Sequence, residues 1–166
     1  MGKLQLIHWN TAECEQRAAF LRQAGYTVDT TLPNGPPFLR RLSEDPPDAV
    51  LIDLSRMPSR GREVGTSLRM RKSTRFLPLV FLGGEADKVA RIQQLLPDAI
   101  YSGWEQVLAT LENLPLELSD SLYIPQSIFE AYAGTPLPQK LGIKAGARVG
   151  LVNVPQGILD ALVDLP

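Results

Sequence analysis

The sequence predicts an α/β fold in which a five-stranded parallel sheet is covered by helices on both faces. Strand-like and helix-like segments alternate regularly over the first 114 of the 166 residues. Such alternation implies right-handed βαβ crossovers, which make the strands parallel. In addition, the third strand-like run, residues 48–54 (DAVLIDL), is almost continuously apolar. This pattern is typical of a strand that is buried on both faces.

Each strand is expected where apolar and β-branched residues cluster, and each helix where apolar residues recur at a spacing of three or four. The expected strands are residues 3–9, 26–31, 48–54, 77–82 and 99–101. The expected helices are residues 11–24, 38–43, 62–72, 85–96 and 105–114. Asn10 or Thr11 is suited to cap the first helix, and Gly25 follows its end. Cys14 falls on the apolar face of this helix, so we expect a buried thiol.

The composition excludes several classes of protein. The chain has 44% hydrophobic and 21% charged residues and a net charge of −1, so it is globular and not a polyanion binder as a whole. The sequence has no long apolar run and no signal-peptide pattern, so we expect a soluble, cytoplasmic protein. With one cysteine and one histidine, His8, it can form neither an internal disulfide nor a Cys/His zinc site. We expect no enzyme activity, metal or cofactor.

The alternation ends after residue 114, where prolines recur. We therefore expect three parts: a domain at residues 1–114, a Pro-rich linker at 115–135 and a short C-terminal extension at 136–166. Residues 147–154 (ARVGLVNV) are expected to form a strand. Because an unpaired apolar strand is an aggregation hazard, we expect a surface of this chain or of another chain to bury Val149, Leu151 and Ile158.

Ligands and reacting groups of an open parallel sheet gather at the carboxyl ends of its strands. The residues to consider there are His8, Trp9 and Asn10 after the first strand, Asp53 and the loop 55–61 after the third, Gly83 and Gly84 after the fourth, and Ser102 and Gly103 after the fifth.

Residues 1–114 resemble the receiver domain of response regulators, a CheY-like, flavodoxin-like fold with strand order 2-1-3-4-5. The resemblance rests on Asp53 at the end of an apolar third strand and on Met57, Pro58 and Gly61 in the following loop. It implies that Asp53 accepts a phosphoryl group in a reaction that needs Mg²⁺, which an acidic pair after the first strand helps to hold. It also implies that a Ser or Thr after the fourth strand and a Lys after the fifth contact the phosphoryl oxygens.

The sequence departs from this pattern at the other functional positions. His8 and Trp9 stand in place of the acidic pair, and Gly83 in place of the hydroxyl residue. No Lys, Arg or His occurs between Arg91 and Lys140, so the fifth strand is followed by no lysine.

We therefore expect a degenerate, pseudo-receiver domain that acts as a non-catalytic signalling or interaction module. In this interpretation Asp53 is a solvated carboxylate that caps local backbone amides. Two alternatives stay open: a small domain that binds an anionic ligand, and a response regulator that is phosphorylated at Asp53.

Residues 56–75 carry seven Lys or Arg residues and a single acid, Glu63. The cations are Arg56, Arg60, Arg62, Arg69, Arg71, Lys72 and Arg75. We expect Arg56, Arg60 and Arg62 to bind an anion or a partner, with the backbone amides of Gly83 and Gly84 as further candidates. A solvated helix face is the alternative.

The remaining candidates concern partners. Tyr101 and Trp104 could form a partner-binding surface beside the fifth strand, although such aromatics are also common in cores. Nucleic acid is not expected as a partner, because no aromatic residue is interleaved with the basic residues before Phe76.

The C-terminal segment also has a resemblance. Residues 134–144 (GTPLPQKLGIK), followed by Gly146, Arg148, Val149 and Pro155, resemble the opening of a family of small uncharacterised bacterial proteins. This resemblance implies no activity. We expect a protein partner, with assembly of copies of this chain through the extension as one form of it.

Overall fold

The computed structural model describes residues 2–115, 122–126, 138, 141–150 and 152. The chain divides into two units, residues 1–131 and 132–166. The sheet and the helices described below belong to the first unit. None of the described helices is both long enough and apolar enough to cross a bilayer.

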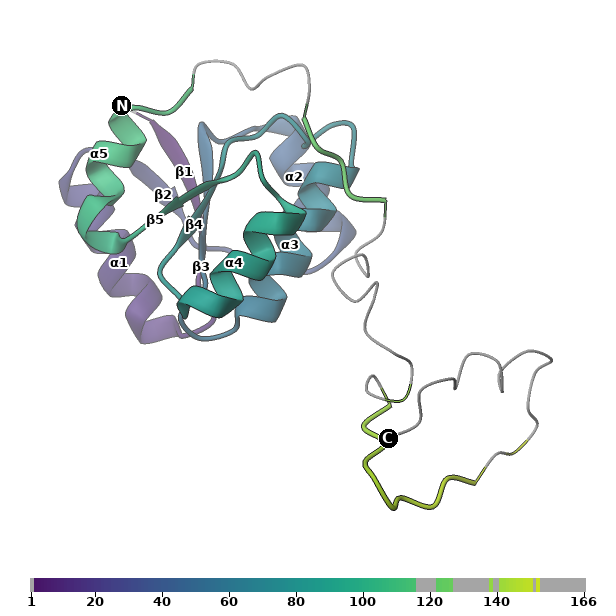
Figure 1. Cartoon of the computed structure of the whole chain (residues 1–166). Helices are drawn as coiled ribbons and strands as arrows, with labels where there is room; N and C mark the ends of the chain where they lie inside the picture. Colours follow the sequence, from purple (N-terminus) through teal and green to yellow (C-terminus); the bar gives the residue numbers. More distant parts are fainter. Residues whose placement is uncertain (1, 116–121, 127–137, 139–140, 151, 153–166) are drawn as a thin grey trace. The chain divides into compact units, whose positions relative to one another are not determined.

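A parallel sheet with the order β2-β1-β3-β4-β5 forms the centre of the first unit (Figure 1). Its strands are β1 (Lys3–Ile7), β2 (Thr27–Asp29), β3 (Ala49–Asp53), β4 (Leu79–Leu82) and β5 (Ile100–Ser102). All five residues of β3 are buried, as expected for a central strand that is covered on both faces. The predicted fold class and strand order are confirmed.

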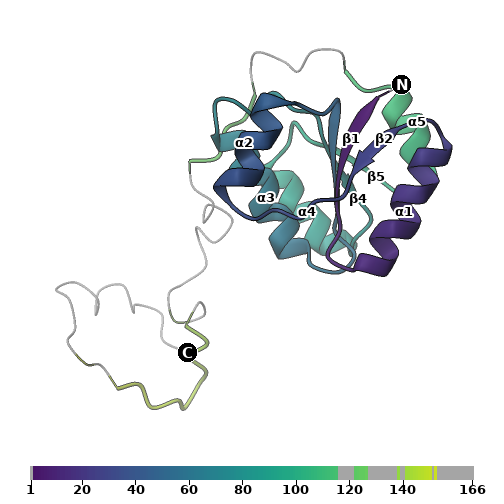
Figure 2. The same ribbon diagram turned by 180° about the vertical axis from the view of Figure 1, so that it is seen from behind.

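Helices cover both faces of the sheet. They are α1 (Thr11–Gln23), α2 (Pro36–Glu44), α3 (Pro58–Met70), α4 (Ala86–Leu95) and α5 (Val107–Glu112), which follows the short 3-10 helix η1 (Trp104–Gln106). Figures 1 and 2 show α1 and α5 on one face and α2, α3 and α4 on the other.

Two apolar cores lie on opposite faces of the sheet because successive side chains of a strand point to opposite sides. One core joins Leu6 and Leu51 of the strands with Cys14 of α1 and Val107 of α5. The other joins strand residues such as Phe81 with buried residues of α2, α3 and α4. Cys14 is buried, as predicted. Full burial of one large apolar side chain contributes roughly 1.5–3 kcal/mol, so these two layers account for most of the stabilisation of the unit.

The predicted boundaries lie within two residues of the observed ones, with one exception. Helix α3 begins at Pro58, whereas the sequence predicted residue 62. Proline is well suited to the first position of a helix, because its fixed φ is helical and an N–H there would have no intrahelical acceptor. Consequently Arg60 lies in the first turn of α3 and not in the loop before it, and Arg62 lies one turn further into the helix.

In the C-terminal segment, residues 144–147 form a turn. The amide of Ala147 donates to the carbonyl of Lys144 at 3.0 Å, and Gly146 has a φ of +76°. The predicted strand at 147–154 is wrong for residues 147–150 and 152, which lie in no strand. A strand needs a hydrogen-bonded neighbour, and among the described residues none pairs with this segment.

Within the described part of the chain, Val149 is not buried as predicted. Val149 is 46% exposed and Val152 is 85% exposed. Leu151 and Ile158 lie outside the described residues. The boundaries at 114, 135 and 136 and the assembly of copies through the extension stay predictions.

Candidate functional site

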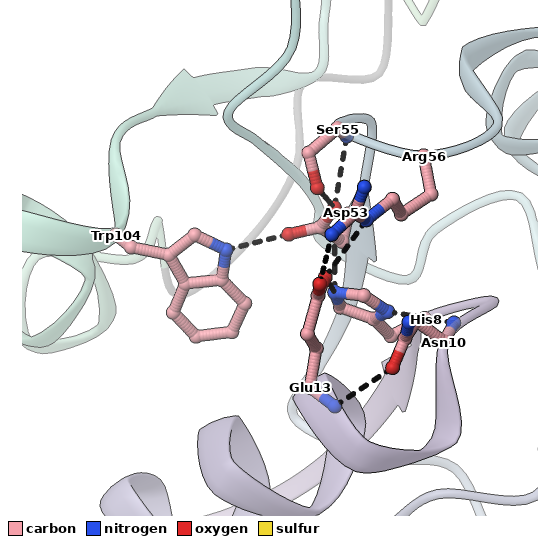
Figure 3. A network of polar contacts seen from close by, with 7 residues as sticks. All are labelled: His8, Asn10, Glu13, Asp53, Ser55, Arg56 and Trp104. Atoms are coloured by element: carbon pink, nitrogen blue, oxygen red, sulfur yellow. Dashed lines mark hydrogen bonds and ion pairs between the residues drawn. The ribbon is translucent and has the colours of Figure 1, made fainter.

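The carboxyl edge of the sheet brings three predicted positions together (Figure 3). Asp53 is the last residue of β3, His8 follows β1 and Trp104 begins η1 after β5. Asp53 is 2% exposed and His8 is 3% exposed. The expectation of a solvated Asp53 is therefore wrong, because β1 and β4 flank the end of β3 and the Trp104 side chain reaches its carboxylate.

Both carboxylate oxygens of Asp53 accept hydrogen bonds. Oδ1 accepts from the backbone amide of Ser55 at 2.8 Å and from the Ser55 hydroxyl. Oδ2 accepts from the indole Nε1 of Trp104 at 2.6 Å. The bond from the Ser55 amide confirms the predicted local capping. These bonds offset the cost of keeping a carboxylate out of water.

His8 lies between two carboxylates. Its Nδ1 accepts from the backbone amide of Asn10 at 3.0 Å, so the neutral imidazole carries its proton on Nε2. Nε2 lies 3.4 Å from Oε2 of Glu13 and 3.7 Å from Oδ1 of Asp53. The imidazole N–H thus points towards both acids.

Asn10 explains why Glu13 reaches this site. Asn10 is the N-cap of α1, and its Oδ1 accepts from the amide of Glu13 at 3.0 Å. This cap fixes the first turn of α1 beside the end of β1. The short segment HWNTAE therefore brings the imidazole and a carboxylate together by local geometry alone.

Glu13 forms a two-pronged ion pair with Arg56. The guanidinium Nε donates to Oε2 at 3.1 Å, and Nη2 donates to Oε1. This pairing lowers the pKa of Glu13 and raises the pKa of Arg56. Arg56, a predicted anion-binding residue, is thus held by an acid of its own chain. The sequence did not indicate this pair, since the two residues are 43 positions apart.

The two predicted partner-surface aromatics pack within the first unit. Trp104 is half-buried, and the guanidinium carbon of Arg17 lies 4.5 Å from its ring centroid. Tyr101 stacks on Phe81 with the ring centroids 5.3 Å apart, and its hydroxyl donates to the carbonyl of Leu96 at 2.9 Å. Burial raises the pKa of Tyr101. Partner binding by these two rings stays a prediction.

Gly83 and Gly84 form the turn between β4 and α4, with φ angles of +65° and +95°. The amide of Gly83 donates to the carbonyl of Ser102 at 3.1 Å, so it is already used within the fold. A Cβ at Gly84 would lie 2.8 Å from the Cβ of Leu54. Close packing and left-handed backbone account for this pair of glycines, and anion binding at this turn stays a prediction.

Arg69 does not belong to the predicted basic surface. It is 1% exposed, and its Nη1 donates to the carbonyls of Arg75 at 2.6 Å and Leu77 at 2.8 Å. Its burial lowers its pKa. The end of α3 is thereby tied to the segment that leads into β4. The sequence could not reveal that Arg69 faces inward, because its hydrogen-bond acceptors are backbone carbonyls, which every residue has.

The other basic residues meet cations of α4 that the sequence did not single out. Arg56, Arg60 and Arg62 line a hollow of about 420 Å³ together with Lys88 and Arg91. The spacing of Lys88 and Arg91, three positions apart, was a usable signal that both lie on one helix face. The contact between α3 and α4, which brings the two groups of cations together, could not be predicted from the sequence.

In the part of the chain that the structure describes, no cluster of three or more His, Cys, Asp and Glu side chains is arranged to hold a metal ion.

No protein-family model matches the chain, and no curated protein matches it by sequence. Solved structures are similar to it in fold. Chemotaxis protein CheY4 of Vibrio cholerae matches with a TM-score of 0.55 and 20% identity, covering 69% of this chain and 99% of CheY4. The N-terminal domain of a response regulator receiver protein from Methanoculleus marisnigri JR1 matches with a TM-score of 0.49 and 18% identity, covering 70% of this chain and 98% of that domain.

A third similar structure is the signal receiver domain of a modulated diguanylate cyclase from Desulfovibrio desulfuricans G20. It matches with a TM-score of 0.48 and 18% identity, covering 68% of this chain and 91% of that domain. The strand order and the CheY4 match lead to one conclusion: the first unit has the flavodoxin-like fold of CheY-like receiver domains.

Proposed function

We propose that the first unit is a signalling module with a receiver fold that binds a protein partner and does not accept a phosphoryl group at Asp53. The observation that carries this proposal is the engagement of both Asp53 oxygens, one by Ser55 and the other by Trp104. A carboxylate that attacks a phosphoryl group needs a free oxygen with open access. Asp53 is 2% exposed and has neither.

The residues around Asp53 do not fit Mg²⁺. This ion takes octahedral oxygen ligands and is usually bound through one or two carboxylates. His8 directs an N–H at Asp53, and the carboxylate of Glu13 is occupied by Arg56. Filling the site with Mg²⁺ would require breaking the bonds of both acids. Metal-assisted phosphoryl transfer therefore has no support from these side chains.

The charge around Asp53 argues in the same direction. A phosphoryl group on Asp53 would need a nearby cation to balance its charge. The receiver pattern calls for a lysine after the fifth strand, whereas Trp104 occupies that region as a neutral donor. The guanidinium of Arg56, which interacts electrostatically with Asp53, is already paired with Glu13.

The network has a structural consequence that suits a constitutive module. Through Asp53, it connects the end of β3 with η1 and with the residue that follows β1 (Figure 3). Loops that follow three different strands are therefore held in one arrangement. A surface supported by these loops would be presented to a partner without a preceding phosphorylation step.

Phosphorylation of the full chain tests the proposal. The protein is incubated with acetyl phosphate and Mg²⁺, and a response regulator that accepts this donor serves as the positive control. The intact mass of each protein is measured by mass spectrometry. The indole N–H signal of Trp104 is followed by NMR in parallel. We expect no phosphorylated species and an unchanged Trp104 signal. A stable adduct that Asp53→Asn abolishes would overturn the proposal.

A further inference from the structure

A hollow of about 420 Å³ lies between the beginning of α3 and one side of α4. Five cations line it: Arg56, Arg60, Arg62, Lys88 and Arg91. No acidic residue is among its described lining residues; Glu63, Glu85 and Asp87 lie on or beside the same helices but outside the lining. Positive charge is therefore concentrated here in a chain whose net charge is −1.

Much of this charge is accessible. Arg60 and Arg91 are exposed, and neither forms an ion pair with any described residue. Arg56 pairs with Glu13, and Lys88 pairs with Glu85 at 2.9 Å. Both pairs lie at the surface, where such pairs contribute little, about 0–1 kcal/mol, so an incoming anion can compete for these cations.

The backbone adds to the positive potential. Helix α3 spans 13 residues, and its N-cap, Met57, provides no side-chain hydrogen bond. Its first turn contains no acidic residue. The positive end of the α3 dipole, which has no side-chain cap from Met57, thus lies beside the cations of the hollow.

We propose that this hollow binds an acidic segment of a partner protein. Carboxylates of Asp or Glu side chains would pair with Arg60 and Arg91, since guanidinium forks bind carboxylates through two parallel hydrogen bonds. Met57, which is 39% exposed at the rim, offers an adaptable apolar contact for one side chain of that segment. The inference rests on the proposed role as a protein-binding module, but not on the proposed lack of phosphorylation.

The lining favours a peptide over other anions. No aromatic residue is among its described members, so bases of a nucleic acid or a nucleotide would have nothing to stack on. Small-molecule sites are mostly apolar and bury most of the ligand, whereas this hollow is open to solvent and dominated by cations. Cations spread over two helices match carboxylates spread along an extended chain.

Binding of a synthetic peptide to the full chain tests the inference. The probe is a fluorescein-labelled peptide of alternating Asp and Glu with one central Leu, and binding is measured by fluorescence anisotropy. The test variant is Arg60→Glu/Arg91→Glu. The matched control is Arg40→Glu/Lys72→Glu, which makes the same change in net charge at two exposed positions outside the hollow. Circular dichroism checks that both variants fold.

We expect the test variant to bind the peptide at least about tenfold more weakly than the unmodified chain, and the control to differ by less than about twofold. A neutral Asn/Gln peptide should not bind. The inference is overturned if the acidic peptide fails to bind, if both double variants lose affinity equally, or if oligo-dT or tripolyphosphate binds more tightly than the peptide. None of these results bears on phosphorylation of Asp53, so the two proposals can fail separately.

Discussion

The Asp53 carboxylate illustrates how the fold can hold one side chain at a strand end through both of its oxygens. It is buried, and its hydrogen bonds come from a neighbour in sequence, Ser55, and from a distant indole, Trp104. The local bond costs little chain entropy, because only two positions separate donor and acceptor. The distant bond is the informative one, since it forms only when β3 and β5 are correctly aligned in the sheet.

Trp104→Phe removes the indole donor and leaves Oδ2 of Asp53 buried with an unmet acceptor. Such a loss costs about 1–3 kcal/mol. We expect the free energy of unfolding in urea to fall by that amount. Trp9→Phe is the matched control, because Trp9 packs against the core and makes no hydrogen bond to Asp53. Equal losses in the two variants would mean that ring size, not the hydrogen bond, determines the effect.

Glu13 provides a pH-dependent contribution whose sign follows from its lowered pKa. The bonds and charge of Arg56, with smaller contributions from His8 and Arg17, favour the ionised carboxylate in the folded state. The resulting stabilisation is complete above the ordinary pKa of a glutamate and is lost as pH falls through the lowered folded value. We expect the stability difference between the unmodified chain and Glu13→Gln to shrink in acid. Denaturation curves at a series of pH values measure it, and a constant difference would contradict the assignment.

At the scale of elements, the turn between β4 and α4 shows that two adjacent glycines can be required for different structural reasons. Both Gly83 and Gly84 adopt left-handed backbone, yet only at Gly84 would an added Cβ meet another side chain. A Cβ at Gly83 would meet nothing within 4 Å. The geometry of the two glycines is that of a tight connection between a strand and a helix, and anion binding by the Gly84 amide stays a prediction.

Substituting the two glycines separately distinguishes backbone strain from crowding. Gly83→Ala should cost about 1 kcal/mol, which is the ordinary cost of a left-handed non-glycine residue. Gly84→Ala adds the clash with Leu54 and should cost at least about 1–3 kcal/mol more, as for other overpacked positions. Thermal unfolding followed by circular dichroism compares them. If the two variants unfold at the same temperature, Leu54 moves away freely and crowding is not a constraint.

At the scale of the whole molecule, the order of elements could be predicted because apolar patterning records which faces are buried. The continuous apolar run that ends at Asp53 identified the central strand. The predicted start of α3 is four residues too late, because Pro58 stands in a segment typical of a loop, although proline favours the first turn of a helix. The site was predicted only in part. The sequence indicated Asp53, but the Glu13–Arg56 pair and the inward-facing Arg69 depend on tertiary contacts between distant positions.

The buried Cys14 can serve as a probe for transient detachment of α1 from the sheet. It is the only cysteine of the sequence, and burial raises the pKa of its thiol, so the reactive thiolate is scarce and shielded while α1 is docked. A maleimide can therefore label the folded protein only during transient exposure of the layer formed by α1 and α5. We expect the labelling rate in water to lie far below that in urea, and to rise in Trp104→Phe. Fast labelling of the native chain would show that this helical layer detaches readily from the sheet.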